Sequence, residues 1–247
     1  MAMRWKKKLY FTHRWLALVI GLQLLAWSVG GFMFSFLDID NVHGDWERDM
    51  RPPPPLDVER VKLTPADVLA AAVAGGITRE DVVRLTIGPR FGGIGYDLLD
   101  EDGVALATVD AASGVVTQRI SEDDAVQAAL SDFTPDATVR SVEYLEGDPP
   151  SEYRGNPMPV YRVDLEHPKN PHLYVSPVTG EVIKRRNRPW RIFDFFWMLH
   201  IMDYRERSDF NHWLLTGASA LAILTSATGL ILWTFRLPCR RTGRAGA

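Results

Sequence analysis

Two long apolar runs without a formal charge constrain this chain of 247 residues more than any other feature. The first run, 15–36, has 22 residues and the second, 213–235, has 23. A helix of about 20 residues crosses the roughly 30 Å hydrocarbon core of a bilayer. We therefore expect two transmembrane helices, at 15–36 and 211–235. These runs exclude a soluble cytosolic enzyme, and two spans cannot enclose a transport pathway without several copies.

Basic residues flank both runs at the ends of the chain. Five Lys and Arg residues lie in the N-terminal tail (1–14) and four in the C-terminal tail (236–247), and neither tail contains Asp or Glu. The positive-inside rule places both tails in the cytoplasm. We expect a bacterial inner (plasma) membrane protein with cytoplasmic termini, a periplasmic central domain and the lipid bilayer as a partner. The single cysteine, Cys239, falls in the C-terminal tail, so the central domain folds without disulfides.

The central region is strongly acidic and then becomes basic near the second run. Residues 37–183 hold 27 Asp and Glu against 12 Lys and Arg, which argues against nucleic acid as a partner. Five basic residues then follow: Lys184, Arg185, Arg186, Arg188 and Arg191. An aromatic segment overlaps them, which is typical of a helix at the membrane surface. We expect a basic collar and an interfacial helix at 185–210.

The acidic region contains the same order of elements twice, with a period of about 60 residues. A helix that starts at Thr64 and Pro65 and a second that starts at Ser121 both have capping residues in place. Strand-like segments follow the first helix at 82–87, 95–99 and 105–109, and the second at 139–145, 160–165 and 172–175. We expect a linker at 37–57, one repeat at 58–120 and another at 121–184.

These elements resemble a known family. A helix followed by a small sheet that ends in a strand and a Ser/Thr-Gly turn is similar to the PepSY domain. The residues that carry this likeness are Tyr161-Arg162-Val163, Tyr174-Val175 and Thr179-Gly180-Glu181-Val182. The flanking segments, from His13 to Leu16 and from Thr228 to Trp233, resemble PepSY-associated transmembrane helices. The expected fold is an α+β membrane protein with two transmembrane helices, an interfacial helix and a periplasmic domain of two PepSY-like helix-plus-antiparallel-sheet repeats.

The resemblance also implies a setting. Larger relatives with four spans include bacterial siderophore-iron reductases that hold haem b between membrane helices. One implied function is an accessory or binding subunit of a membrane redox or iron-handling complex. The alternative is a haem-b-binding electron-transfer component of a ferric-siderophore-reductase-like system. The sequence contains no nucleophile, flavin or nicotinamide motif, so we favour the accessory subunit over an oxidoreductase.

Three histidines adjoin apolar helices and are the candidate cofactor-binding residues: His13, His200 and His212. A neutral imidazole at a helix end suits the iron of haem b. The other interpretation is that the rings anchor helix ends at the interface and bind nothing. A helix from His13 to residue 36 is ~36 Å long, so His13 and His212 are expected at opposite membrane faces.

His200 and His212 are expected at the same face, 12 residues apart. The charged segment 203–209 between them favours a bend, which would let both rings reach one iron. Asp194, Asp203 and Asp209 are candidates to orient the imidazoles. His13 would need a ligand partner from a second copy or another subunit.

Two further inferences concern contacts. His167 and His172 flank a Pro-Lys-Asn-Pro loop, and the sequence favours exposed loop histidines there over a metal site.

Both spans also carry small residues suited to close helix contact. In the first span these are Gly21, Gly30 and Gly31, and in the second Gly217, Ala218, Ala220, Ala222, Ala227 and Gly229. We expect a homodimer or docking against other membrane subunits.

Overall fold

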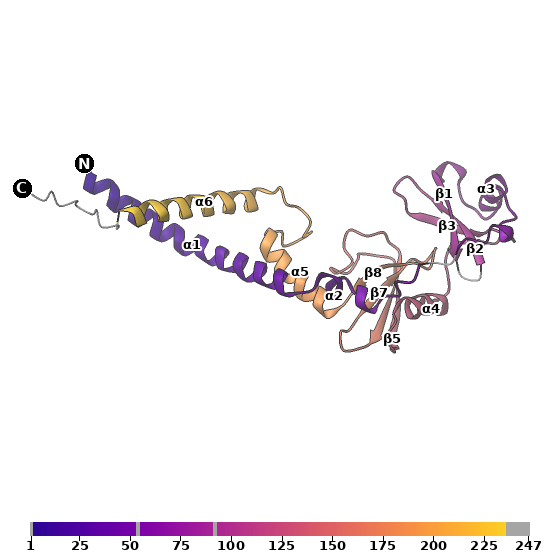
Figure 1. The fold of residues 1–247 in the computed structure, drawn as a ribbon. Coiled ribbons are helices and arrows are strands. Elements are labelled where there is room, and N and C mark those ends of the chain that lie inside the picture. Colours follow the sequence, from indigo (N-terminus) through magenta and orange to yellow (C-terminus); the bar gives the residue numbers. More distant parts are fainter. Residues whose placement is uncertain (1, 53–54, 91–92, 236–247) are drawn as a thin grey trace, which may run out of the picture. The chain divides into compact units, whose positions relative to one another are not determined.

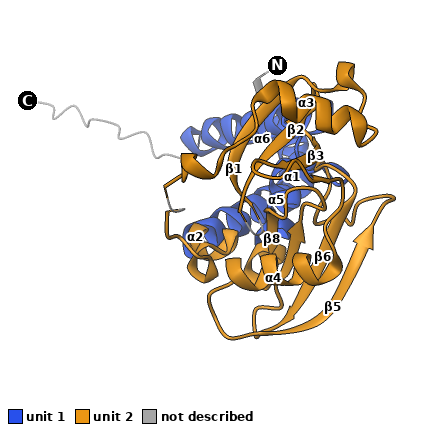
Figure 2. Cartoon of the chain, turned by 90° about the vertical axis from the view of Figure 1, so that its right-hand side faces the viewer, with its two compact units in different colours: residues 1–36, 193–247 blue, residues 37–192 orange. Residues whose placement is uncertain are grey.

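The computed structural model describes residues 2–52, 55–90 and 93–235. The C-terminal tail with Cys239 lies outside the described residues, so its cytoplasmic position stays a prediction. The chain divides into two compact units, which are coloured separately in Figure 2. We call Met1–Phe36 with Phe193–Ala247 the helical unit and Leu37–Ile192 the two-sheet unit.

The two-sheet unit contains two antiparallel sheets (Figure 1). In each sheet the strands lie in sequence order. The first sheet consists of β1 (Arg84–Arg90), β2 (Gly93–Leu99), β3 (Ala105–Asp110) and β4 (Val116–Thr117). The second consists of β5 (Thr138–Leu145), β6 (Val160–Glu166), β7 (His172–Val175) and β8 (Val182–Arg186). The helices of this unit are α2 (Ile39–His43), α3 (Pro65–Ala74) and α4 (Glu122–Asp132), with 3-10 turns at Asp45–Glu47, Val58–Arg60 and Arg79–Asp81. The expected mixed α+β class with two antiparallel sheets is confirmed.

Capping residues start α3 and α4 where the sequence predicts. The Thr64 hydroxyl accepts the backbone N–H of Asp67 (3.3 Å), and the Asp67 carboxylate accepts the backbone N–H of Thr64 (2.9 Å). Ser121 and Asp124 form the same reciprocal pair at the start of α4. Such a cap contributes about 0.5–2 kcal/mol because it satisfies helix N–H groups that have no partner in the helix.

Each helix covers one face of the sheet that follows it. Val68 of α3 is fully buried against Tyr96 and Leu98 of β2. Because side chains alternate along a strand, Asp97 between them points to the opposite face, which no helix among the described residues covers. The core under α4 is built in the same way from Ala125, Ala128, Ala129, Tyr161, Val163, Leu165, Leu173 and Val175. Each sheet therefore has a helix-covered face and a helix-free face.

The start and end of β1 differ from the prediction. The backbone N–H of Val82 bonds to the carbonyl of Arg79 (3.2 Å) and closes a 3-10 turn, so the strand begins at Arg84 instead of residue 82. β1 then continues to Arg90, pairing with β2 as far as Gly93. A Cβ on Gly95 of β2 would lie 2.8 Å from a methyl carbon of Thr108, so a larger residue there would force Thr108 to shift.

The helical unit contains α1 (Ala2–Phe36), α6 (Trp213–Thr234) and the end of α5 (Arg188–Ile201), which begins in the two-sheet unit. In the part of the chain that the structure describes, two segments are long and apolar enough to cross a membrane, Lys7–Phe36 and Trp213–Thr234. α1 begins well before residue 15, because the preceding Lys and Arg residues are good helix formers. α1 and α6 pack together, with Trp5 and Phe235 in ring contact (centroids 5.6 Å apart).

Candidate functional site

His212 caps the start of α6. Its Nδ1 accepts the backbone N–H of Leu215 (3.4 Å), and its Nε2 lies 2.9 Å from the carbonyl oxygen of Ile201, the last residue of α5. A neutral imidazole has one acceptor nitrogen and one donor nitrogen. Because Nδ1 accepts, the proton lies on Nε2 and is donated to Ile201. Both nitrogens of His212 are therefore engaged within the chain.

Two side chains of α1 bond to the neighbouring carbonyls at the end of α5. Gln23 Nε2 donates to the carbonyl of Leu199 (3.2 Å), and Trp27 Nε1 donates to the carbonyl of His200 (2.8 Å). The last carbonyls of a helix have no partner within the helix, and in an apolar environment an unsatisfied one is costly. Together with His212, three donors satisfy three successive carbonyls and fix the end of α5 to α1.

The side chain of His200 lies among aromatic rings. Its ring centroid is 5.5 Å from that of Phe34, 6.4 Å from Trp27 and 6.5 Å from Trp197. Its Nδ1 is buried and has no hydrogen-bond partner among the described residues. A Cβ on Gly30 would lie 3.9 Å from this nitrogen, so the glycine leaves space beside it. His200 is thus a half-buried imidazole whose Nδ1 is buried and has no partner among the described residues.

His13 packs against α6 near the other end of that helix. The Thr228 hydroxyl donates to the carbonyl of Leu224 (2.8 Å), so it accepts the bond from His13 Nδ1 (2.9 Å). This leaves His13 Nε2 as the acceptor nitrogen, 3.6 Å from where a Cβ of Gly229 would lie. Thr228 follows His212 by 16 residues, about 24 Å of helix, so His13 and His212 are far apart as expected.

A haem iron shared by His200 and His212 does not fit this arrangement. Two free imidazole nitrogens at a single iron position are not found among the described residues of one chain. Both ring nitrogens of His212 already form hydrogen bonds, one to the end of α5 and one to the start of α6. His13 has the orientation of a ligand, with a hydroxyl on Nδ1, but its Nε2 faces its own neighbouring helix. The predicted pair of ligands therefore requires His212 to release its cap.

The carboxylates predicted to orient the imidazoles make other bonds that fold the bend after α5. Asp194 pairs with Arg207. Asp203 accepts the backbone N–H of Glu206 (3.1 Å), among other backbone groups of the bend, and Asp209 accepts that of Asn211 (2.7 Å). The charged segment does bend the chain, as the sequence predicts, because its acidic side chains bond to its own backbone.

The two histidines of the Pro-Lys-Asn-Pro loop are not exposed, which corrects the prediction. The His167 ring packs edge-on against an aromatic ring, and His172 Nδ1 donates to Glu152 Oε1 (2.5 Å). Glu152 also accepts bonds from the Tyr174 hydroxyl (2.9 Å) and Arg191 Nε (2.7 Å). Burial opposes the charged carboxylate, but the bonds from His172 and Arg191 outweigh it and lower the pKa of Glu152 to about 2. Burial and the nearby Glu152 raise the pKa of Tyr174.

Three arginines of the basic collar are used inside the two-sheet unit. Arg185 forms an ion pair with Asp132, and Arg191 pairs with the Glu152 carboxylate. The Arg186 guanidinium lies over the Trp190 ring, 4.1 Å from its centroid. These contacts stabilise the second sheet and the start of α5.

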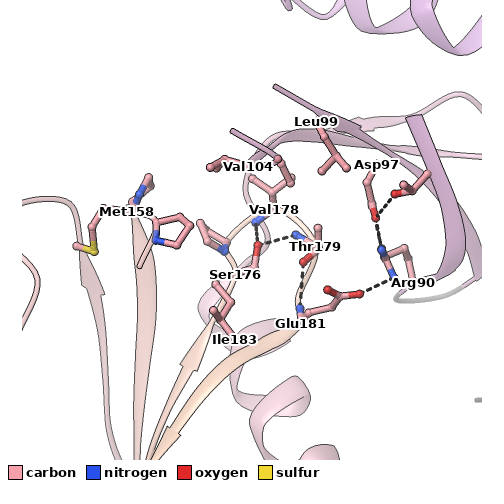
Figure 3. Close-up of a pocket in the computed structure, with 16 residues that line it drawn as sticks. Arg90, Asp97, Leu99, Val104, Met158, Ser176, Val178, Thr179, Glu181 and Ile183 are labelled. Carbon is pink, nitrogen blue, oxygen red and sulfur yellow. Dashed lines mark hydrogen bonds and ion pairs between the residues drawn. The ribbon is translucent and has the colours of Figure 1, made fainter. Parts of the chain in front are cut away.

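A cleft lies where the two sheets meet, on the helix-free face of the first sheet (Figure 3). Its cavity has a volume of about 410 Å³. Leu99 and Val104 from the first repeat form one wall, and Val178 and Ile183 from the second repeat form another. Met158, from the loop before β6, lines one end. The walls are therefore mainly apolar and come from both repeats.

A buried ion pair lies at the other end of the cleft. Arg90 Nε donates to Asp97 Oδ1 (2.8 Å), and the side chain of Asp97 is only 4% exposed. Hydrogen bonding to Asp97 raises the pKa of the Arg90 guanidinium. Arg90 also contacts Glu181 (3.2 Å), whose side chain is 64% exposed. Because Asp97 neutralises Arg90, the rim of the cleft presents the carboxylate of Glu181.

The turn between β7 and β8 joins the two repeats. The backbone N–H of Ile120 donates to the carbonyl of Pro177 (2.7 Å), and the Thr108 hydroxyl donates toward the carbonyl of Val178 (3.2 Å). The Ser176 hydroxyl accepts the N–H of Thr179 (3.1 Å) and holds the turn in shape. The turn is thus fixed on the helix-free face of the first sheet, where it forms part of the cleft.

Comparison with known families identifies the family of this chain. A family model described as the PepSY-associated TM region matches residues 10–246. The chain belongs to this family. No curated protein and no solved structure matches it. In this PepSY-associated TM protein the matched region includes most of α1, all of α6 and both sheets, so the cleft and the three candidate histidines lie within it.

The cleft of this PepSY-associated TM protein is suited to binding and was missed at the sequence level. No group of three or more His, Cys, Asp or Glu side chains among the described residues is arranged to hold a metal ion. The available signal was Asp97, a lone acid within the otherwise apolar strand from Gly93 to Leu99, with Arg90 at the end of the strand before it. In the sequence, the turn at Thr179 indicated the repeat, but it did not indicate that this turn forms part of a cleft wall.

Proposed function

We propose that this membrane protein is an accessory subunit that binds an extended segment of a partner protein in the cleft of its two-sheet unit. The cleft carries the proposal, because its mainly apolar walls and few polar groups are typical of binding sites. Its volume of about 410 Å³ lies within the range of roughly 300–1,000 Å³ seen for ligand sites. The neutralised Arg90–Asp97 pair gives one end of the cleft a fixed, polar boundary.

Charge indicates the chemistry of the bound segment. Residues 37–183 hold 27 acidic against 12 basic residues, so a basic partner is attracted to this unit. Within the cleft, Glu181 offers the exposed carboxylate next to apolar walls. The proposed segment therefore has an apolar side chain for the cavity and a Lys or Arg that pairs with Glu181.

The proposed setting is the bacterial inner membrane, with both termini in the cytoplasm and the two-sheet unit in the periplasm. The basic tails and the two apolar helices support this orientation. The resemblance to larger siderophore-iron reductases supports a membrane redox or iron-handling complex as the host. The partner would then be another subunit of that complex.

The alternative function is a haem-b electron-transfer component. It would need an imidazole beyond those that one chain makes available, because His212 is engaged at both nitrogens and His13 faces α6. An absorption spectrum of detergent-purified protein, expressed with ample haem, decides between the two. Low-spin Soret and α bands would favour the electron-transfer function. Their absence would favour the accessory subunit.

Site-specific photocrosslinking in native membranes tests the cleft. We expect a benzoylphenylalanine at Val104, in the cleft wall, to give one discrete product of higher mass. The matched control is the same residue at Val115, which is exposed but outside the cleft. Glu181→Gln, combined with the probe at Val104, should reduce the product because it removes the rim charge. Equal products from both positions, or no effect of Glu181→Gln, would contradict the proposal.

A further inference from the structure

A second cavity shares the turn between β7 and β8 with the cleft. It has a volume of about 540 Å³ and is lined by three segments: 48–51, the end of α4, and 180–185. Most of its lining side chains are charged, in contrast to those of the cleft: Arg48, Asp49, Arg51, Asp132, Glu181 and Arg185. We call it the polar cavity. Its composition suits a charged ligand, because charged groups form the strongest hydrogen bonds with groups of opposite charge.

Four of these charges form two ion pairs within the chain. Arg185 donates to both oxygens of the Asp132 carboxylate, with its Nε 2.5 Å from Oδ2. Arg51 donates to the Asp49 carboxylate, with its Nε 2.9 Å from Oδ1. Each pair is a two-point contact between a guanidinium and a carboxylate, which is the strong geometry for these groups. The charges left to meet a ligand are those of Arg48 and Glu181.

Arg48 lies next to a carboxylate that another arginine already occupies. Its Nε is 3.9 Å from Asp132 Oδ1, and that oxygen accepts its hydrogen bond from Arg185. Among the described residues the Arg48 side chain donates no hydrogen bond, and it is 45% exposed. A guanidinium carries five N–H donors and matches a carboxylate at two points. Arg48 is therefore available to bind an anionic group that enters the polar cavity.

The backbone of Arg48 is fixed to the end of α4. Arg48 and Phe133 form an isolated antiparallel bridge, and Phe133 is buried in the core under α4. Next to the bridge, the backbone N–H of Asp49 donates to the carbonyl of Asp132 (2.8 Å). A ligand that binds Arg48 therefore orders one side chain and no loop. This lowers the entropic cost of binding.

Glu181 lines both cavities and supplies the opposite charge. Its side chain is 64% exposed, and its partner Arg90 is neutralised by Asp97. Gly180 precedes it in the turn with a φ of 72°, a left-handed backbone conformation that favours glycine. Because Gly180 has no side chain, it adds no barrier between the cleft and the polar cavity. A bound segment can therefore cross the turn there, with one charge on Glu181 and the opposite charge on Arg48.

We propose that the polar cavity is a subsite in which Arg48 binds the carboxylate of an Asp or Glu of the segment held in the cleft. This inference rests on the proposed function for the segment itself. The segment then places an apolar residue in the cleft, a Lys or Arg at Glu181 and an acidic residue at Arg48. Charges of both signs make the recognition selective, because a segment with basic residues alone would be repelled by Arg48.

Photocrosslinking in native membranes tests the subsite separately from the cleft. A benzoylphenylalanine at Ser131, which lines the polar cavity, is expected to give a product of the same mass as the probe at Val104. The control position is Ala112, which is exposed and lines neither cavity. Arg48→Gln should lower the Ser131 product about threefold because it removes the charge that binds the carboxylate. Arg51→Gln should lower it little, because Arg51 binds Asp49.

The other outcomes of this experiment overturn one proposal or both. A product at Val104 without one at Ser131, or equal losses from the two arginine variants, overturns the subsite and leaves the cleft. A product at Ser131 without one at Val104 overturns the cleft and the shared segment. No product from either position overturns both proposals.

A binding measurement on the full-length protein in detergent tests the carboxylate directly. Two labelled peptides with blocked ends, Leu-Lys-Gly-Asp and Leu-Lys-Gly-Asn, differ only in that group. Fluorescence anisotropy should show about fivefold tighter binding of the Asp peptide. The ratio should fall to about one in Arg48→Gln and persist in Arg51→Gln. Equal affinities of the wild type for both peptides, or no binding of either, would overturn the carboxylate subsite, and this comparison requires no variant to fold.

Discussion

Removing the charge of Glu152 is expected to destabilise the two-sheet unit substantially. The folded carboxylate has a pKa of about 2 against an ordinary value of 4.5, because bonds from His172 and Arg191 outweigh its burial. At 1.36 kcal/mol per pKa unit, its ionised form contributes about 3 kcal/mol at neutral pH. Glu152→Gln removes that contribution and leaves Arg191 without its counter-charge. For a unit of this size the melting temperature should fall by about 6–12 °C.

The assay is thermal unfolding of the full-length protein in detergent, followed by circular dichroism. The pKa is lowered by folding, so the contribution is complete above about pH 4.5 and is lost as the pH falls toward about 2. The wild type should therefore lose stability relative to Glu152→Gln in that window. The control is Glu143→Gln, because Glu143 is 54% exposed and its pair with Arg162 is worth less than about 1 kcal/mol. Equal melting shifts for the two variants would refute the reasoning.

Three further predictions concern the helical unit and the topology. His212→Ala should cost about 1 kcal/mol and increase hydrogen exchange at the start of α6, because the cap is lost; unchanged exchange would show that the cap is dispensable. Gly229→Val should separate α1 from α6, because a Cβ there would lie 3.2 Å from His13 Cε1. Crosslinking between the two helices should therefore fall. The control is Gly217→Val, where a Cβ would meet nothing within 4 Å. In intact spheroplasts, a membrane-impermeant thiol reagent should label a cysteine introduced at Asp100 and should not label Cys239. Labelling of Cys239 from outside would contradict the predicted topology.

Local signals predicted the elements well, because their causes lie within a few residues. Thr64 with Asp67 and Ser121 with Asp124 start helices wherever they occur before an apolar face. The strands after them were placed to within a few residues, and the main error, at the start of β1, came from the 3-10 turn that includes Arg79. A turn of this kind depends on a single backbone bond that the residue pattern does not reveal.

The candidate site could be predicted only in part, because its geometry depends on residues distant in the sequence. The sequence selected His212 as an ionisable group beside an apolar helix, yet its bonds depend on where α5 ends, 11 residues earlier. The cleft depends on the turn at Val178 reaching Thr108, 70 residues away. Asp97 is tolerated inside a strand because Arg90 and Thr108 form hydrogen bonds to its carboxylate. Both partners belong to other strands, so the sequence of β2 alone does not predict them.

The contact between the turn at Val178 and the first sheet gives the pair of repeats a direction, because, among the described residues, the second repeat binds to the first and the first does not bind to the second in the same way. A turn of one repeat occupies the helix-free face of the repeat before it, which is a head-to-tail contact that could in principle continue with further copies. The second sheet does not offer that face, because Tyr153 of the loop before β6 stacks on Tyr174 (centroids 4.3 Å apart). The loop therefore acts as a terminator of the array. Shortening it to a tight hairpin should open the face and cause concentration-dependent chains, detectable by sedimentation, whereas an unchanged particle would mean that the face cannot accept a turn.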